Sequence, residues 1–134
     1  MKKILSILLL IACVLCVSSC VGDATVSPAE ATTFEEVSAI LEANAETYRL
    51  SDDAEITQHE QFFSSDYNDY TNVFYSMCYA KMADGKYIKC VQMITTTDAE
   101  YFVRSYGANF DYVVRKGGLV LFGTSSFIAE FEAK

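Results

Sequence analysis

Hydrophobic positions along this chain recur with two periods: every three to four residues in some segments, as in helices, and every second residue in others, as in strands. The first helical segment follows a capping box, Thr33-Phe34-Glu35-Glu36. Its apolar positions are Phe34, Val37, Ile40, Leu41, Ala45 and Tyr48. We therefore expect an amphipathic helix over residues 34–49, with this stripe packed against the core.

Residues 51–64 are ambiguous between the two periods. The segment from Glu55 to Phe63 fits an edge strand or a short helical turn. The prediction favours the strand. A polar connection over residues 64–72 follows it.

Two runs typical of strands, residues 73–82 and 86–95, flank Ala83-Asp84-Gly85 and predict a hairpin. A two-residue turn would set Cys78 opposite Val91. A three-residue loop, with Gly85 in the left-handed conformation, sets Cys78 opposite Cys90. The second register is preferred because it matches apolar with apolar residues in four pairs: Phe74 with Ile94, Tyr75 with Met93, Met77 with Val91, and Ala80 with Ile88.

The remaining third of the chain repeats this order of elements. Thr97-Asp98-Ala99-Glu100 is a second capping box and predicts a helix that ends at Gly107. A second hairpin is expected over residues 110–116 and 119–122, joined by Gly117-Gly118. A short last helix, capped within Thr124-Ser125-Ser126, carries Phe127, Ile128 and Phe131.

These elements predict an α+β fold in two layers. The expected order is one helix, an uncertain strand, and then two strand–strand–helix units. We expect an antiparallel sheet of about four to five strands with the helices on one face.

The start of the chain has a different character. Lys2 and Lys3 precede an apolar run from Ile4 to Val17, 14 residues interrupted only by Ser6. A helix that crosses a membrane needs about 20 apolar residues, so the run is read as a secretory leader. Val17-Ser18-Ser19-Cys20 at its end resembles the signal of bacterial lipoproteins. The resemblance implies that Cys20 receives diacylglycerol and becomes the first residue of the mature chain.

Two alternatives to Cys20 stay open. Leu10-Ile11-Ala12-Cys13 fits the same pattern, but cleavage there would leave a very short leader. An ordinary leader could also be cut near Cys20 or Gly22. With Cys20 as the lipid carrier, residues 1–19 are the signal peptide, residues 20–32 a flexible tether, and residues 33–134 one domain. The expected location is the cell membrane or outer membrane, on its extracytoplasmic side.

The cysteine count supports this division. Cys13 and Cys16 leave with the leader, and Cys20 carries the lipid, so the domain keeps Cys78 and Cys90. Exported proteins meet oxidising conditions. An even pair in the domain therefore predicts a disulfide between Cys78 and Cys90.

The charge of the chain limits its partners. After the leader, 18 acidic residues face 8 basic ones, a formal charge of −10. This field repels nucleic acid and gives no attraction to an anionic membrane surface. Attachment to a membrane is therefore expected through the lipid anchor alone.

Motifs for chemistry are sparse. His59 is the only histidine, which excludes a multi-histidine metal site, and no cofactor or metal is expected. A cysteine nucleophile with His59 as its base is an alternative to the disulfide. Gly123-Thr124-Ser125-Ser126-Phe127 lacks the closing glycine of a nucleophile elbow.

The polar loop is the remaining candidate site. Tyr67, Asn68, Asp69 and Tyr70 combine aromatic and polar side chains, a composition found where proteins contact saccharides or other proteins. Asp66, Asn68 and Asp69 offer oxygen ligands, but the residues that complete a calcium loop are absent.

These observations lead to three functional hypotheses. The first is a lipid-anchored envelope protein whose domain binds an envelope protein or a saccharide without catalysing a reaction. The second is a secreted enzyme or enzyme inhibitor that acts through the tyrosine-rich loop or His59. The third is a structural subunit of an envelope assembly.

Overall fold

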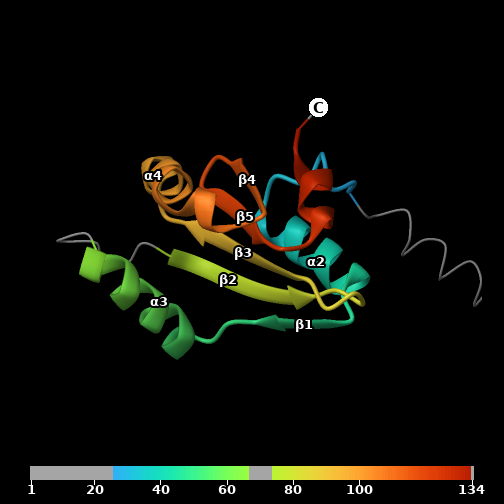
Figure 1. Ribbon diagram of the computed structural model, residues 1–134, viewed down its shortest axis with the longest axis horizontal. Coiled ribbons are helices and arrows are strands. Elements are labelled where there is room, and N and C mark those ends of the chain that lie inside the picture. Colours follow the sequence, from blue (N-terminus) through green and yellow to red (C-terminus); the bar gives the residue numbers. More distant parts are fainter. Residues whose placement is uncertain (1–25, 67–73, 134) are drawn as a thin grey trace, which may run out of the picture.

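A five-stranded antiparallel sheet forms the centre of the computed structural model, which describes residues 26–66 and 74–133 (Figure 1). The strand order is β1-β2-β3-β5-β4, so β1 and β4 are the two edges. The α+β class and the antiparallel sheet are confirmed. The strands are β1 Thr47–Leu50, β2 Phe74–Lys81, β3 Tyr87–Met93, β4 Tyr112–Lys116 and β5 Leu119–Gly123.

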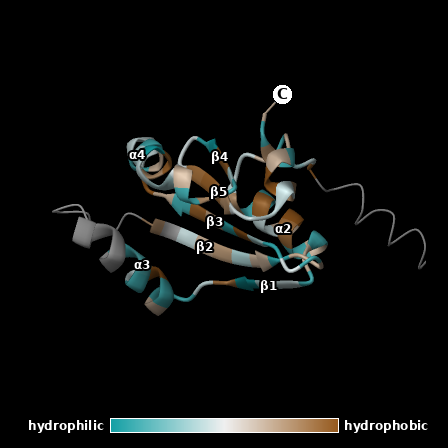
Figure 2. Ribbon diagram, in the orientation of Figure 1, coloured by the Kyte–Doolittle hydropathy of each residue, from teal (hydrophilic) through white to brown (hydrophobic). Residues whose placement is uncertain are grey.

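Helices cover both faces of this sheet, which corrects the expectation of a single helical layer. Every residue of β5 is buried, so neither of its faces meets solvent, and its ribbon is strongly hydrophobic (Figure 2). One face packs on α2 and η2, and the other on α4 and on Ile56 of α3. The helices are α2 Phe34–Asn44, α3 Asp53–Asp66, α4 Thr96–Tyr106 and the short 3₁₀-helices η1 Gly107–Asn109 and η2 Ser126–Phe131.

Helix α2 begins as expected but ends five residues early. Its capping box is complete: the Thr33 hydroxyl accepts from the Glu36 N–H at 3.2 Å, and the Glu36 carboxylate accepts from the Thr33 N–H at 3.2 Å. At Ala45 the backbone becomes extended. Tyr48 then pairs with Ala80 in the sheet. The prediction of a helix over residues 45–49 is wrong. Pairing with β2 stabilises this stretch more than a further helical turn would.

The expected strand within residues 51–64 is also wrong, since α3 occupies this segment. The Asp52 carboxylate accepts from the Glu55 N–H at 2.9 Å, and the Asp52 carbonyl accepts from the Ile56 N–H at 3.0 Å. This arrangement is an N-terminal helix cap. The edge position that the strand would have filled belongs to β1.

The first hairpin has the expected three-residue loop. The Met82 N–H donates to the Lys86 carbonyl at 2.8 Å, and Gly85 has the left-handed φ of 83°. Cys78 lies opposite Cys90, as predicted. The register shifts near the start of β2, so Phe74 pairs with Met93 and the expected pairs of Phe74 with Ile94 and Tyr75 with Met93 are wrong. A β-bulge of this kind adds one residue to one strand.

The C-terminal elements follow the sequence closely. Helix α4 starts two residues early because Thr95, with Asp98 as its partner, forms the cap. The helix ends at Gly107 as expected. In the second hairpin Lys116 faces Leu119 across a two-residue turn whose first glycine has a φ of 59°. The Ser125 side chain caps η2.

Residues 26–32, part of the expected tether, lie against the domain. The Lys116 ammonium donates to the carbonyls of Pro28, Ala29 and Ala31 at 3.2, 2.9 and 2.7 Å. Ala31 is fully buried in the core. We name this contact the Lys116 clip.

Among residues 26–66 and 74–133, no helix is both long and apolar enough to cross a membrane.

Candidate functional site

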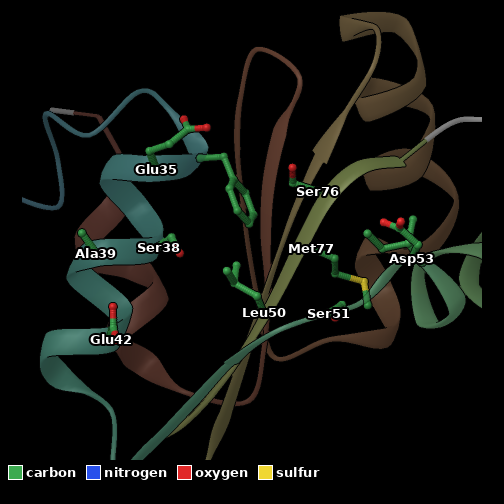
Figure 3. Close-up of a pocket in the computed structure, with 11 residues that line it drawn as sticks. Glu35, Ser38, Ala39, Glu42, Leu50, Ser51, Asp53, Ser76 and Met77 are labelled. Carbon is green, nitrogen blue, oxygen red and sulfur yellow. The ribbon is translucent and has the colours of Figure 1, made fainter.

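A groove of about 490 Å³ lies between α2, the end of β1, the start of α3 and β2 (Figure 3). We name it the α2–α3 groove. It exists because β1 is short: the strand ends at Leu50, and the Ser51 N–H makes the last bond to β2, at 2.9 Å from the Met77 carbonyl. The chain then turns away into α3 and leaves the space beside α2 open.

The floor of the groove is apolar. It is formed by Phe34, Leu50, Ile56 and Met77. Leu50 is 61% exposed and lies between α2 and β2 (Figure 3). Covering a leucine side chain fully is worth roughly 1.5–3 kcal/mol, so this residue would gain from contact with a partner.

The rim of the groove is acidic. Glu35 and Glu42 are seven residues apart on α2 and so project from the same side of the helix, and Asp53 lies across the groove (Figure 3). All three side chains are exposed. No lysine or arginine is among the described residues that line the groove. The rim therefore presents uncompensated negative charge above an apolar floor.

Arg49, a strand neighbour of Leu50, is directed to Glu55. Its guanidinium donates to the two Glu55 carboxylate oxygens at 2.6 and 2.8 Å and lies 5.4 Å from the centre of the Tyr79 ring. This bidentate pair lowers the pKa of Glu55 to about 2. The pairing leaves the groove without a counterion from β1.

The Ser51 hydroxyl lies in the groove wall. Its oxygen is buried, and its interaction with the Glu55 carboxylate, after that of Arg49, helps to lower the pKa of Glu55.

Cys78 and Cys90 lie beneath α2 as free, fully buried thiols that face each other across β2 and β3. Hydrogen bonding from Cys90, then from Tyr48, lowers the pKa of Cys78, whereas burial raises the pKa of Cys90 well above its usual value. The Tyr48 hydroxyl is also hydrogen-bonded to Ser38. A disulfide between the two cysteines stays a prediction.

The structure does not support a cysteine nucleophile paired with His59. Cys90 faces α2, whereas its strand neighbour Lys89 faces the opposite side of the sheet, where His59 lies on α3. The sheet separates the thiols from the imidazole. Burial, followed by the charge of Lys89, lowers the pKa of His59.

The other candidate residues from the sequence lie outside the described residues. These are the lipid attachment residue Cys20 and the loop residues Tyr67, Asn68, Asp69 and Tyr70. They stay predictions. Within the described ranges, no three histidine, cysteine, aspartate or glutamate side chains are grouped to hold a metal ion.

Sequence reasoning missed the groove residues. Glu35 and Glu42 have the helical spacing that places them on one side, and Leu50 stands beside Asp52-Asp53 at an element boundary. These signals are weak, because the groove depends on four elements that meet only after folding.

Comparison with known protein families, characterised proteins and solved structures finds no match to this chain.

Proposed function

We propose that this protein is an envelope lipoprotein, anchored through Cys20, whose domain binds a segment of another envelope protein in the α2–α3 groove. The partner segment carries lysine or arginine beside apolar side chains. The observation that carries this proposal is the exposed Leu50 below an acidic rim without a lining base.

Charge and apolar contact have separate roles in this binding. Exposed ion pairs contribute only about 0.2–1 kcal/mol each, so the carboxylates of Glu35, Glu42 and Asp53 mainly select and steer a cationic partner. The apolar floor supplies most of the affinity. Binding should therefore weaken moderately, without being lost, as the salt concentration rises.

The groove favours binding over catalysis. No histidine or cysteine is among its described lining residues, and its serine hydroxyls have no imidazole base beside them. The acidic rim points to a cationic protein segment rather than a neutral saccharide.

The test of the groove is photo-crosslinking in intact cells. A photoreactive phenylalanine replaces Leu50, and a matched control replaces Tyr112, which is 37% exposed on the opposite edge strand. We expect one discrete protein adduct from position 50 and none of that mass from position 112. Equal labelling from both positions, or no adduct from position 50, would refute the groove as the binding site.

Charge reversal sharpens this test. The double change Glu35→Lys with Glu42→Lys should reduce the yield of the adduct from position 50 several-fold. The control Glu130→Lys with Glu132→Lys alters two exposed acids outside the groove and changes the net charge equally. If both double variants reduce the yield equally, overall charge and not the rim governs binding.

The anchor is tested independently. Cys20→Ser should abolish acylation and release the protein from the membrane fraction, and globomycin should block its processing. Cys13→Ser is the matched control and should leave both unchanged. Normal processing and membrane retention of Cys20→Ser would refute the anchor without affecting the groove.

A further inference from the structure

A second cavity lies on the face of the sheet that α3 and α4 cover, and its lining shares no residue with that of the α2–α3 groove. Aromatic rings make up most of its lining, from β2, α4, β5 and the segment between η1 and β4. Its volume is about 160 Å³. We name it the aromatic pocket; its rings are Phe74, Phe102, Tyr106, Phe110 and Phe122.

Phe122 is central to this cluster of rings. Its ring centre lies 4.5 Å from that of Phe110 and 5.2 Å from that of Phe102, and the Phe102 and Tyr106 centres are 5.4 Å apart. The rings are tilted against each other by 43° to 47°. This arrangement is the one that aromatic rings prefer.

The size of the pocket limits its ligand. An engineered protein cavity of about 150 Å³ lined by apolar side chains stays dry and binds benzene. The aromatic pocket, at about 160 Å³, therefore admits one six-membered ring or a short branched hydrocarbon group.

Lys89 gives this apolar pocket a charged end. It lies on β3 opposite Phe122 of β5, so both side chains project from the same face. Among the described residues Lys89 forms no ion pair, because the ion pairs there join Arg49 with Glu55 and Arg115 with Glu100. Lys89 as a whole is half-buried and lines the pocket together with the aromatic rings. An anionic group on the ligand would supply the missing partner.

His59 completes the polar side of the pocket. The half-buried imidazole lies on α3 and lines the cavity together with Lys89. Because its pKa is lowered, the ring is neutral at pH 7 and one of its nitrogens carries a hydrogen to donate.

We propose that the aromatic pocket binds a small carboxylic acid. Its ring or branched hydrocarbon group lies among Phe102, Phe110 and Phe122, and its carboxylate accepts hydrogen bonds from the Lys89 ammonium and the His59 ring. This site does not depend on the α2–α3 groove, so an experiment that refutes one proposal leaves the other standing.

The test uses the full chain in detergent and a pair of probes with the same ring. 4-Fluorophenylacetate carries a carboxylate at pH 7, whereas 4-fluorophenylacetamide is neutral, and fluorine NMR measures the binding of each. A charge-assisted hydrogen bond predicts that the acid binds about tenfold more tightly or better. Absent binding of the acid, or equal binding of acid and amide, would overturn the proposal.

Variants locate the binding. Lys89→Met should reduce the affinity for the acid to that for the amide, and Lys89→Arg should retain most of the preference. The matched control Lys86→Met, an exposed residue next to the hairpin turn, should change neither affinity. An unchanged preference in Lys89→Met, or an equal loss in Lys86→Met, would overturn the assignment. If Lys89→Met fails to fold, the same two probes are compared on Lys89→Arg and Lys86→Met. A preference for the acid that both variants retain supports the proposal, and equal binding of acid and amide overturns it.

Discussion

Replacement of Lys116 by methionine tests the packing of the N-terminal segment. The change removes three hydrogen bonds, from the Lys116 ammonium to the carbonyls of Pro28, Ala29 and Ala31, and keeps a stem of similar length. A hydrogen bond from a charged donor contributes roughly 1.5–3 kcal/mol. The three carbonyls share one ammonium, and water can replace some of the lost hydrogen bonds. We therefore expect a loss of about 2 kcal/mol in the free energy of unfolding.

This loss corresponds to a decrease of roughly 10 °C in Tm for a domain of this size. Urea unfolding followed by tyrosine fluorescence measures the global effect. Hydrogen exchange at the Ala31 amide, which donates to the Ser27 carbonyl at 3.0 Å, reports the local one. Lys86→Met is the matched control. If Lys116→Met loses no more stability than Lys86→Met and the Ala31 amide stays equally protected, the Lys116 clip does not hold the segment.

Three further predictions test local features. Thr33→Ala removes the cap of α2 and should lower the free energy of unfolding by about 1 kcal/mol in urea, whereas an unchanged midpoint would contradict the role of the capping box. Arg49 lowers the pKa of Glu55 from 4.5 to about 2, so the pair stabilises the fold fully above about pH 4.5 and loses this effect as the pH falls towards 2. Arg49→Met should flatten that part of a plot of stability against pH, and a plot that keeps its slope would show that other groups cause it. The disulfide predicted between Cys78 and Cys90 implies that reduction raises the intact mass of the purified protein by two hydrogens, and an equal mass before and after reduction would exclude it.

Local chemistry made the hairpins predictable from the sequence. The loop around Gly85 and the apolar pairs beside it define the register that sets Cys78 opposite Cys90. The turn at Gly117 and the cap at Thr33 likewise depend on neighbouring residues only. Such features need no knowledge of distant parts of the chain.

Tertiary contacts decided the elements that were predicted wrongly. Tyr48 continues the helical spacing of α2, yet it forms part of β1 because it packs on the core from there, opposite Ala80. The continuous apolar run Leu119–Phe122 is a signal of burial on both faces, which would have predicted helices on both sides of the sheet.

The candidate site was beyond sequence reasoning for the same reason. Leu50 is exposed only because β1 stops at this residue and the chain turns into α3. The aromatic pocket joins rings that lie up to 48 positions apart, from Phe74 to Phe122. No spacing rule relates residues so distant along the chain.

If the protein is anchored through Cys20 as proposed, the Lys116 clip would also limit how far the domain can move from a membrane. With residues from Val26 onwards fixed to the domain, only five residues separate it from the proposed anchor at Cys20. Even fully extended, six residue steps reach no more than about 21 Å. A linker of this length would hold the domain close to the lipid surface. Only partners within that narrow layer could then reach the α2–α3 groove.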